Sequence, residues 1–152
     1  MAAVPRKAKE KKSVSHAAAP ELLVLSREDA EAYEPRGREI CISISDPDAE
    51  PARVSPRFVS VLRLYFNDIT ERGEPSDILF AHEHAMSIAQ FIDGWPSAER
   101  VVVHCNMGVS RSPGVALGLC DLRGWATAQL ERSYPGWNRL VRTVMNEAGI
   151  SK

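Results

Sequence analysis

Residues 101–113 combine the side chains needed to bind a phosphate group and to attack it. They read VVVHCNMGVSRSP, so five residues separate Cys105 from Arg111. The planar fork of an arginine matches two phosphate oxygens, and a cysteine thiolate is a strong nucleophile. A short loop between a strand and a helix can also turn its backbone N–H groups toward one anion. This spacing therefore indicates cysteine-dependent hydrolysis of a phosphate monoester.

Strands and helices alternate on either side of this segment. Apolar runs predict strands at residues 22–25, 40–44, 61–66 and 101–104. Helical spacing and capping residues predict helices at residues 26–33, 77–93, 113–123, 126–133 and 138–148. The alternation predicts a three-layer α/β domain, with a largely parallel central sheet of about four to five strands flanked by helices. Cys105 would then follow the last strand directly.

The segment resembles the protein tyrosine phosphatase signature, His-Cys-x-x-Gly-x-x-Arg-Ser/Thr. Its fixed positions are matched by His104, Cys105, Gly108, Arg111 and Ser112. The Gly-Val-Ser-Arg-Ser ending is similar to the dual-specificity branch, and a looser likeness over residues 40–145 looks most like the small bacterial members of that branch. The resemblance implies a dual-specificity phosphatase-like fold and a phosphocysteine intermediate, with no metal and no cofactor.

Each residue of the loop has an expected role. A helix N-terminus and Arg111 both favour the thiolate form of Cys105. Ser112 would donate a hydrogen bond to the Cys105 sulfur, cap the helix, or do both. His104 is expected to be structural and to fix the loop by hydrogen bonding. The phosphoryl oxygens would be held by Arg111 and by the backbone N–H groups of the loop, which comprises Asn106, Met107, Gly108, Val109 and Ser110.

A departing alkoxide or phenolate also needs a proton from a carboxylic acid on a separate loop. The resemblance places that acid after the strand that precedes the long helix, and Asp68 holds this position 37 residues before Cys105. Asp77, which we expect to cap the helix, and Asp93 at its far end are rivals. Asp46 and Asp48, after an earlier strand, are weaker ones.

Other reactive or aromatic side chains receive structural interpretations. Cys41 lies early in its strand, so a protective disulfide with Cys105, which some relatives form, is disfavoured. Cys120 is expected in the core, and His82 and His84 point in different directions on a helix and cannot easily share a metal ion. The aromatic residues near the C-terminus, Trp125, Tyr134 and Trp137, are expected to pack helices and not a substrate.

Charge and composition restrict the organisation of the chain. Its 152 residues predict one domain over residues 20–152, preceded by a disordered basic tail over residues 1–19. Residues 1–12 carry a local charge of +4, which leaves −5 for the rest and argues against nucleic acid as the main partner. No apolar run approaches the length of a membrane span, and three widely spaced cysteines favour the reducing cytoplasm.

The expected reaction is hydrolysis of phosphotyrosine in proteins, with phosphoserine, phosphothreonine and small phosphomonoesters left open. Members of the family that this segment resembles often carry basic residues in this loop when they act on phosphoinositides or inositol polyphosphates. The loop between Cys105 and Arg111 contains none, which disfavours those substrates. Two alternatives remain: an inactive phosphate-binding module, and another cysteine enzyme with an anion cradle, such as an arsenate reductase or a sulfur transferase. An arsenate reductase would need further thiols, but no other cysteine lies within ten residues of Cys105.

Overall fold

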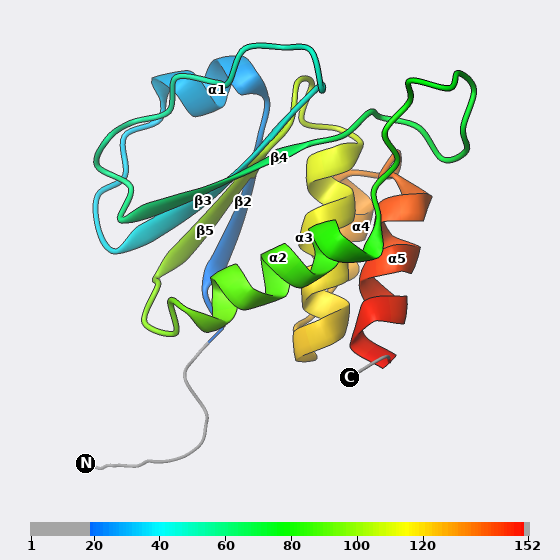
Figure 1. The fold of residues 1–152 in the computed structure, drawn as a ribbon. Helices are drawn as coiled ribbons and strands as arrows, with labels where there is room; N and C mark the ends of the chain where they lie inside the picture. Colours follow the sequence, from blue (N-terminus) through cyan, green and yellow to red (C-terminus); the bar gives the residue numbers. More distant parts are fainter. Residues whose placement is uncertain (1–18, 151–152) are drawn as a thin grey trace.

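Figure 1 shows a computed structural model of the chain, which describes residues 19–150. The elements in chain order are β2 (Glu21–Leu25), α1 (Arg27–Ala32), β3 (Glu39–Ser45), β4 (Ser60–Tyr65), α2 (His82–Asp93), β5 (Arg100–His104), α3 (Arg111–Arg123), α4 (Ala128–Ser133) and α5 (Arg139–Ile150). The predicted basic tail lies almost entirely outside the described residues. Within them, no helix is both long enough and apolar enough to cross a membrane.

The strands form one parallel sheet in the order β2-β5-β3-β4. His104, the last residue of β5, pairs with Leu25 of β2 and with Ser43 of β3. Because every strand runs in the same direction, the segments that follow β3, β4 and β5 meet at one edge of the sheet. The predicted α/β fold with a parallel sheet of four to five strands is confirmed, and Cys105 lies at this edge.

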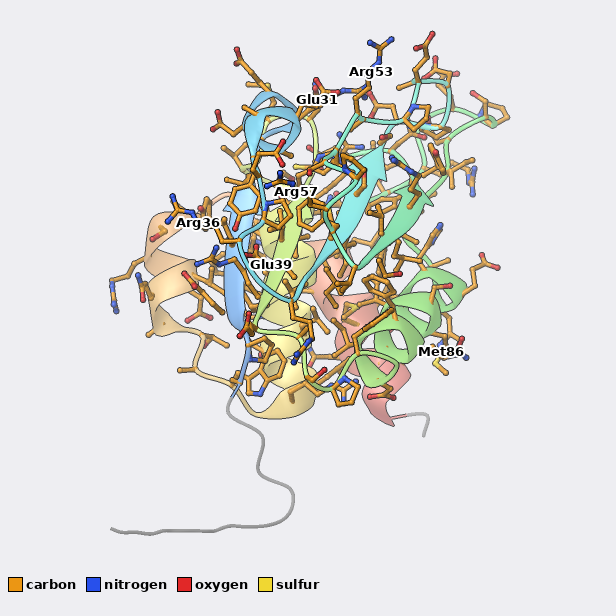
Figure 2. The ribbon with its side chains drawn as sticks, turned by 90° about the vertical axis from the view of Figure 1, so that its left-hand side faces the viewer. Glu31, Arg36, Glu39, Arg53, Arg57 and Met86 are labelled. Carbon is orange, nitrogen blue, oxygen red and sulfur yellow. The ribbon has the colours of Figure 1, made fainter. Side chains whose placement is uncertain are left out.

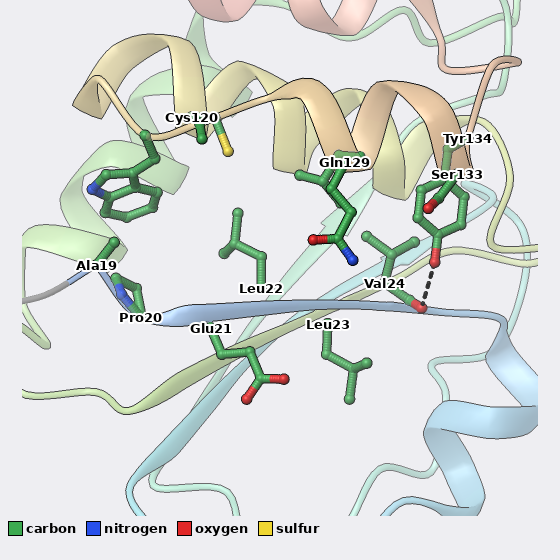
Figure 3. Close-up of a pocket in the computed structure, with 13 residues that line it drawn as sticks. Ala19, Pro20, Glu21, Leu22, Leu23, Val24, Cys120, Gln129, Ser133 and Tyr134 are labelled. Atoms are coloured by element: carbon green, nitrogen blue, oxygen red, sulfur yellow. Dashed lines mark hydrogen bonds between the residues drawn. The ribbon is translucent and has the colours of Figure 1, made fainter.

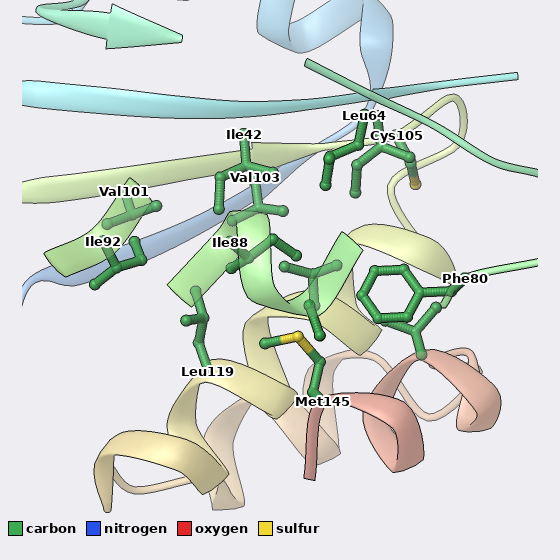
Figure 4. Close-up of a cluster of buried hydrophobic side chains, with 14 of the residues drawn as sticks. Ile42, Leu64, Phe80, Ile88, Ile92, Val101, Val103, Cys105, Leu119 and Met145 are labelled. Atoms are coloured by element: carbon green, nitrogen blue, oxygen red, sulfur yellow. The ribbon is translucent and has the colours of Figure 1, made fainter. Parts of the chain in front are cut away.

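The two faces of the sheet bury different side chains. Alternate residues of the central strands, such as Ile42 and Val103, face the larger core, where α2, α3 and α5 cover the sheet (Figure 4). Cys41 and Val102 face the other way, where Phe58 and the side chain of Tyr33 complete a smaller cluster. In Figure 1, α1 and the loop after β3 lie on this second side. The layers are therefore unequal, with one face covered by most of the helices.

Close contact between α3 and α5 sets the position of the last helix. A Cβ atom on Gly118 would lie 2.6 Å from the Cβ atom of Met145, and one on Gly114 would lie 2.9 Å from the carbonyl oxygen of Asn138. Glycine at both positions lets the two backbones approach. The start of α5, with Asn138 just before it, is thereby held against the start of α3.

The predicted start of α2 at residue 77 is wrong, because the helix begins at His82. Ile78 cannot join the helix, since its carbonyl oxygen accepts the Asn67 N–H at 2.7 Å and its own N–H donates to Asn67 Oδ1 at 2.8 Å. Asp77 therefore does not cap this helix. The other predicted bounds lie within two residues of the observed ones. Ser26 caps α1 as predicted, with its Oγ accepting the Asp29 N–H at 3.1 Å.

The amino-terminal end of the sheet is closed by a buried carboxylate, Glu39, labelled in Figure 2. It accepts hydrogen bonds from the Tyr33 hydroxyl at 2.5 Å and from the Arg36 N–H at 3.0 Å. Arg100 forms an ion pair with it at 3.5 Å and bonds the same tyrosine hydroxyl. These donors together hold the pKa of Glu39 below its usual value against the opposing effect of burial. This end of the sheet is thus a satisfied structural network.

Candidate active site

Cys105 directly follows β5 and is buried, with 2% of its surface exposed. Its sulfur accepts the Gly108 N–H at 3.2 Å and lies 3.1 Å from the hydroxyl oxygen of Ser112 on the first turn of α3. In Figure 4 it lies at the end of the larger core, near Leu64. The apolar residues of the core hold the cysteine in place, while its sulfur faces polar donors of the loop.

The loop after Cys105 is shaped by contacts with the start of α1. Gly108 has φ of 76°, and a Cβ atom there would lie 2.7 Å from the Ser26 nitrogen. Only glycine fits this close approach with this backbone conformation. The carbonyl oxygen of Asn106 accepts the Arg27 N–H at 3.0 Å. The loop therefore curves back over its own cysteine.

Arg111 is the first residue of α3, and it is 4% exposed. Both hydrogen bonds of its guanidinium start from Nη1, one to Asp46 Oδ1 at 2.8 Å and one to the carbonyl oxygen of Phe66 at 2.9 Å. Its Nε is buried and has no partner among the described residues. A buried donor without a partner is costly, and it indicates a position where a ligand oxygen can bind.

His104 is buried at the end of β5. Its Nδ1 lies 3.2 Å from the carbonyl oxygen of Cys105, and its Nε2 lies 2.6 Å from the hydroxyl oxygen of Ser43. A carbonyl only accepts, so we assign the proton to Nδ1 and a donated bond from Ser43 to Nε2. Burial lowers the pKa of His104 and keeps the ring neutral. The ring ties β3 to the cysteine backbone, which fits the structural role expected for it.

Asp68 lies in the loop after β4 and contacts the segment of residues 106–110, which we call the phosphate loop after the role that the sequence predicts for it. Its Oδ1 accepts hydrogen bonds from the Ser110 hydroxyl at 2.7 Å and from Asn138 Nδ2 at 3.0 Å. The Asn138 backbone N–H also bonds the carbonyl oxygen of Ser110 at 2.9 Å. Asn138 is buried and caps α5, because its Oδ1 accepts the Val141 N–H at 3.0 Å. The asparagine thus joins three segments at one point.

The rival carboxylates are engaged elsewhere. Asp77 Oδ2 accepts the N–H groups of Gly73 and Glu74 at 2.8 and 2.6 Å, and these bonds lower the pKa of Asp77. Asp93 forms an ion pair with Arg123 at 2.7 Å. Asp46, which the sequence suggests only as a less favoured candidate for the general acid, forms an ion pair with Arg111. Of these carboxylates, Asp68 alone bonds a side chain of the phosphate loop.

The mouth of the site carries exposed apolar side chains. Met107 is 70% exposed and Val109 is 54% exposed, although both belong to the phosphate loop. A hollow of about 460 Å³ adjoins the loop, lined by Asp68, Ile69, Thr70, Ser110, Pro135, Gly136, Trp137, Asn138 and Arg139. The ring of Trp137, which was expected to pack helices, contacts two arginines of α5, Arg139 and Arg142, and the residue also lines the hollow.

The other cysteines lie apart from this site. Cys41 is in the smaller core cluster, on the opposite face of the sheet from Cys105, and both are free thiols. A disulfide between the two would have to cross the sheet. Cys120 is buried in α3, as expected, and borders a separate hollow of about 470 Å³ between β2 and α4 (Figure 3). Burial raises the pKa of Cys41 to about 12 and that of Cys120 to about 11.

His84 contributes to the start of α2, where its Nδ1 accepts the Ala81 N–H at 2.9 Å. Burial lowers its pKa. Among residues 19–150, no group of three or more histidine, cysteine, aspartate or glutamate side chains could hold a metal ion.

Comparison with known proteins identifies the fold. No family model matches the chain, and no curated protein matches it. Among solved structures, human DUSP28 aligns with a TM-score of 0.61 at 21% identity, covering 88% of this chain and 94% of its own. A mouse putative dual specificity phosphatase complexed with zinc tungstate gives a TM-score of 0.60 at 18% identity, covering 91% and 92%.

A third structure, the human tyrosine phosphatase-like serine/threonine/tyrosine-interacting protein, gives a TM-score of 0.52 at 18% identity, covering 76% of this chain and 78% of its own. The chain therefore has the fold of the dual-specificity phosphatases, as the motif predicts. The likeness to small bacterial members stays a prediction.

The sequence alone did not predict which residues form hydrogen bonds with Arg111, His104 and Asp68. Asp46 could have been recognised, because it follows β3 and so lies at the same sheet edge as Cys105. Ser43 pairs in register with His104, which only the strand order reveals. Asn138 has a visible helix-capping pattern, but its bond to Asp68 joins residues 70 positions apart.

Proposed function

We propose that this protein hydrolyses phosphate monoesters through a phosphocysteine intermediate, with phosphotyrosine in proteins as the leading substrate. One observation carries the proposal. A buried cysteine sulfur accepts a loop N–H and lies beside a serine hydroxyl, and the arginine that closes the same loop has a buried Nε without a partner. An oxyanion above Cys105 would satisfy that donor.

In the first step, the Cys105 thiolate attacks phosphorus and the bond from phosphorus to the leaving oxygen breaks. Arg111 Nε and the loop N–H groups bind the equatorial oxygens, where charge is concentrated in the transition state. Asp46 and the Phe66 carbonyl orient the guanidinium through Nη1. In the second step, water attacks the phosphocysteine, inorganic phosphate leaves, and the thiolate returns. The Ser112 hydroxyl stabilises the departing sulfur.

Asp68 is the proposed general acid for the first step. Both of its hydrogen bonds from the described residues reach Oδ1, so the proton to be transferred would be carried by Oδ2. Ser110 and Asn138 keep the carboxyl group beside the loop. In the second step the resulting carboxylate can accept a proton from the attacking water.

The surroundings of the loop favour a protein substrate with an aromatic phosphoester. Met107 and Val109 present apolar surface beside the mouth, where a phenyl ring can pack. No basic side chain lies between Cys105 and Arg111 to meet the extra phosphates of an inositol ring. The chemistry also needs a free thiol, so we assign the activity to a reducing compartment such as the cytoplasm.

Hydrolysis of p-nitrophenyl phosphate tests the proposal. The wild-type protein should turn over in the presence of EDTA and should be inhibited by vanadate, a phosphate-like oxyanion. Cys105→Ser should lose at least about ten-thousand-fold in kcat yet still bind vanadate, because only the nucleophile is removed. Cys120→Ala is the matched control and should keep its kcat. A wild type that binds vanadate but does not turn over would instead identify an inactive phosphate-binding module.

A further inference from the structure

We propose that the hollow beside Asp68 is a second subsite, in which Trp137 and Arg139 bind an anionic group of the phosphorylated substrate. The inference rests on the proposed function and specifies its substrate class: a phosphoprotein segment with an acidic side chain or a second phosphate near the scissile group. Carboxylate and phosphate present the same chemistry to an arginine, namely oxygen acceptors that carry negative charge.

The hollow is continuous with the site already described. Ser110 of the phosphate loop, Asp68, Trp137 and Arg139 all line it. Gly136 also lines it and leaves room there, because a Cβ atom on Gly136 would meet only the carbonyl oxygen of Val109, at 3.7 Å. Asp68 and Ser110, which are bonded to each other, belong both to this hollow and to the surroundings of the loop, so a group next to the bound phosphate lies within reach of the hollow.

Arg139 differs from the other arginine on the same aromatic ring. The guanidinium of Arg139 lies 4.9 Å from the Trp137 ring centre, and that of Arg142 lies at 5.3 Å. Arg142 is fully engaged, since it bonds Asp121 through Nε at 2.8 Å and Glu131 through Nη1 at 2.9 Å. Arg139 is exposed, and no described carboxylate pairs with it. The ring thus orients a guanidinium whose hydrogen-bond donors are still available.

The opposite side of the phosphate loop has a different charge. The hollow there is about 400 Å³ in volume and is lined by Arg27, Glu28, Glu31 and three uncharged residues, Ser26, Asn106 and Met107. Arg27 is paired with Glu31 at 3.5 Å and also bonds the Glu50 carbonyl, so Glu28 dominates the remaining charge. The hollow on the other side is lined by Arg139 and by Asp68, which is neutral while it holds the proton that it donates. An acidic group on the substrate is therefore repelled on the α1 side and attracted on the Arg139 side. This difference in charge favours the orientation of a bound peptide in which its acidic group lies on the Arg139 side of the phosphate loop.

Peptide binding to the Cys105→Ser variant tests the subsite without requiring turnover. The probes are phosphotyrosine peptides that carry one glutamate, one glutamine or one phosphoserine at successive positions on either side of the phosphotyrosine. At one or two positions, glutamate should bind about five- to ten-fold more tightly than glutamine, and added salt should reduce this ratio. If the phosphoserine peptide binds more tightly than the glutamate peptide, the preferred group is a second phosphate. If the two peptides bind equally tightly, an acidic side chain is sufficient.

A second substitution in the Cys105→Ser variant tests whether the preference for glutamate over glutamine arises in the hollow. Arg139→Gln should bring the glutamate-to-glutamine ratio close to one, whereas Arg132→Gln, which changes an exposed arginine on α4 outside the hollow, should leave it unchanged. Tight phosphopeptide binding without an acidic preference, or a preference that survives Arg139→Gln, would overturn the subsite and leave the proposed function intact. Preserved preference in a protein whose wild type fails to hydrolyse these peptides would support the subsite and reject the hydrolase. If no phosphopeptide binds, the subsite is rejected, and hydrolysis of p-nitrophenyl phosphate still decides the proposed function.

Discussion

Two buried cysteines, Cys41 within β3 and Cys105 just after the neighbouring strand β5, have very different surroundings. Cys41 lies within β3, opposite Val102, in a small apolar cluster where burial raises the pKa of its thiol to about 12. Cys105 is equally buried but lies just beyond the end of β5, where Gly108 and Ser112 direct polar groups at its sulfur. The difference lies in the backbone: N–H groups inside a sheet are paired with neighbouring strands, while those of the loop are free to face an anion.

The same contrast separates two arginines at opposite ends of the sheet, Arg100, which is partly buried, and Arg111, which is buried. Arg100 uses all three guanidinium nitrogens, bonding Glu21 through Nε and Nη2, and Tyr33 and Glu39 through Nη1. Arg111 uses Nη1 alone and leaves Nε buried without a partner. A satisfied network stabilises the fold, whereas an incomplete one has capacity left for a ligand.

Arg111→Lys gives the largest effect that tests this contrast. Lysine keeps the charge but cannot make the bidentate contact, so kcat/KM for p-nitrophenyl phosphate should fall about one hundred- to one thousand-fold. Arg100→Lys at the other end of the sheet should lower the unfolding free energy and leave kcat/KM nearly unchanged. Near-normal rates for Arg111→Lys would mean that the open Nε position is not the phosphate clamp.

Asp68→Asn tests whether the carboxyl group beside the loop acts as the acid. For an aryl phosphate with a basic leaving oxygen, kcat should fall about one hundred-fold, whereas for an acidic leaving group it should change little. Equal losses for every leaving group would contradict the assignment, and Asp77 would be tested next.

Asn138→Ser separates the two roles of the asparagine that bonds Asp68. Serine can still cap α5, so the unfolding free energy should fall by less than about 1 kcal/mol. It is too short to reach Asp68, and the misplaced acid should lower kcat about ten-fold, for basic leaving groups only. A loss of stability without this leaving-group dependence would reduce Asn138 to a structural residue.

The fold and the two central residues could be predicted from the sequence because their signals are local. Apolar runs and caps locate the strands and helices, and the spacing from Cys105 to Arg111 lies within one loop. The start of α2 could not be predicted, because helical spacing continues back to residue 78 while the backbone there is bonded to Asn67. Asp46 and Asn138 act through contacts with Arg111 and Asp68, more than sixty residues away, which only the folded chain creates.

The smallest expected effect concerns Cys41 and depends on pH. The pKa of Cys41 is about 12 in the folded protein, against roughly 8.5 for an unfolded cysteine, so the unfolded chain releases this proton first as the pH rises. The contribution is fully present below about pH 8.5 and is lost progressively up to about pH 12. By pH 10 it should cost the wild type about 2 kcal/mol of unfolding free energy.

Urea unfolding of the wild type and of Cys41→Ala, each at pH 8 and pH 10, isolates this contribution. Other groups that ionise in this range, such as Cys120 and Tyr33, are common to both proteins and cancel in the difference. The wild type should therefore lose about 2 kcal/mol more than Cys41→Ala between the two pH values, while kcat at pH 7 stays within about two-fold in the variant. Equal losses would mean that Cys41 ionises as readily inside the sheet as in the unfolded chain. The position of each thiol relative to the end of its strand would then not explain the difference between Cys41 and Cys105.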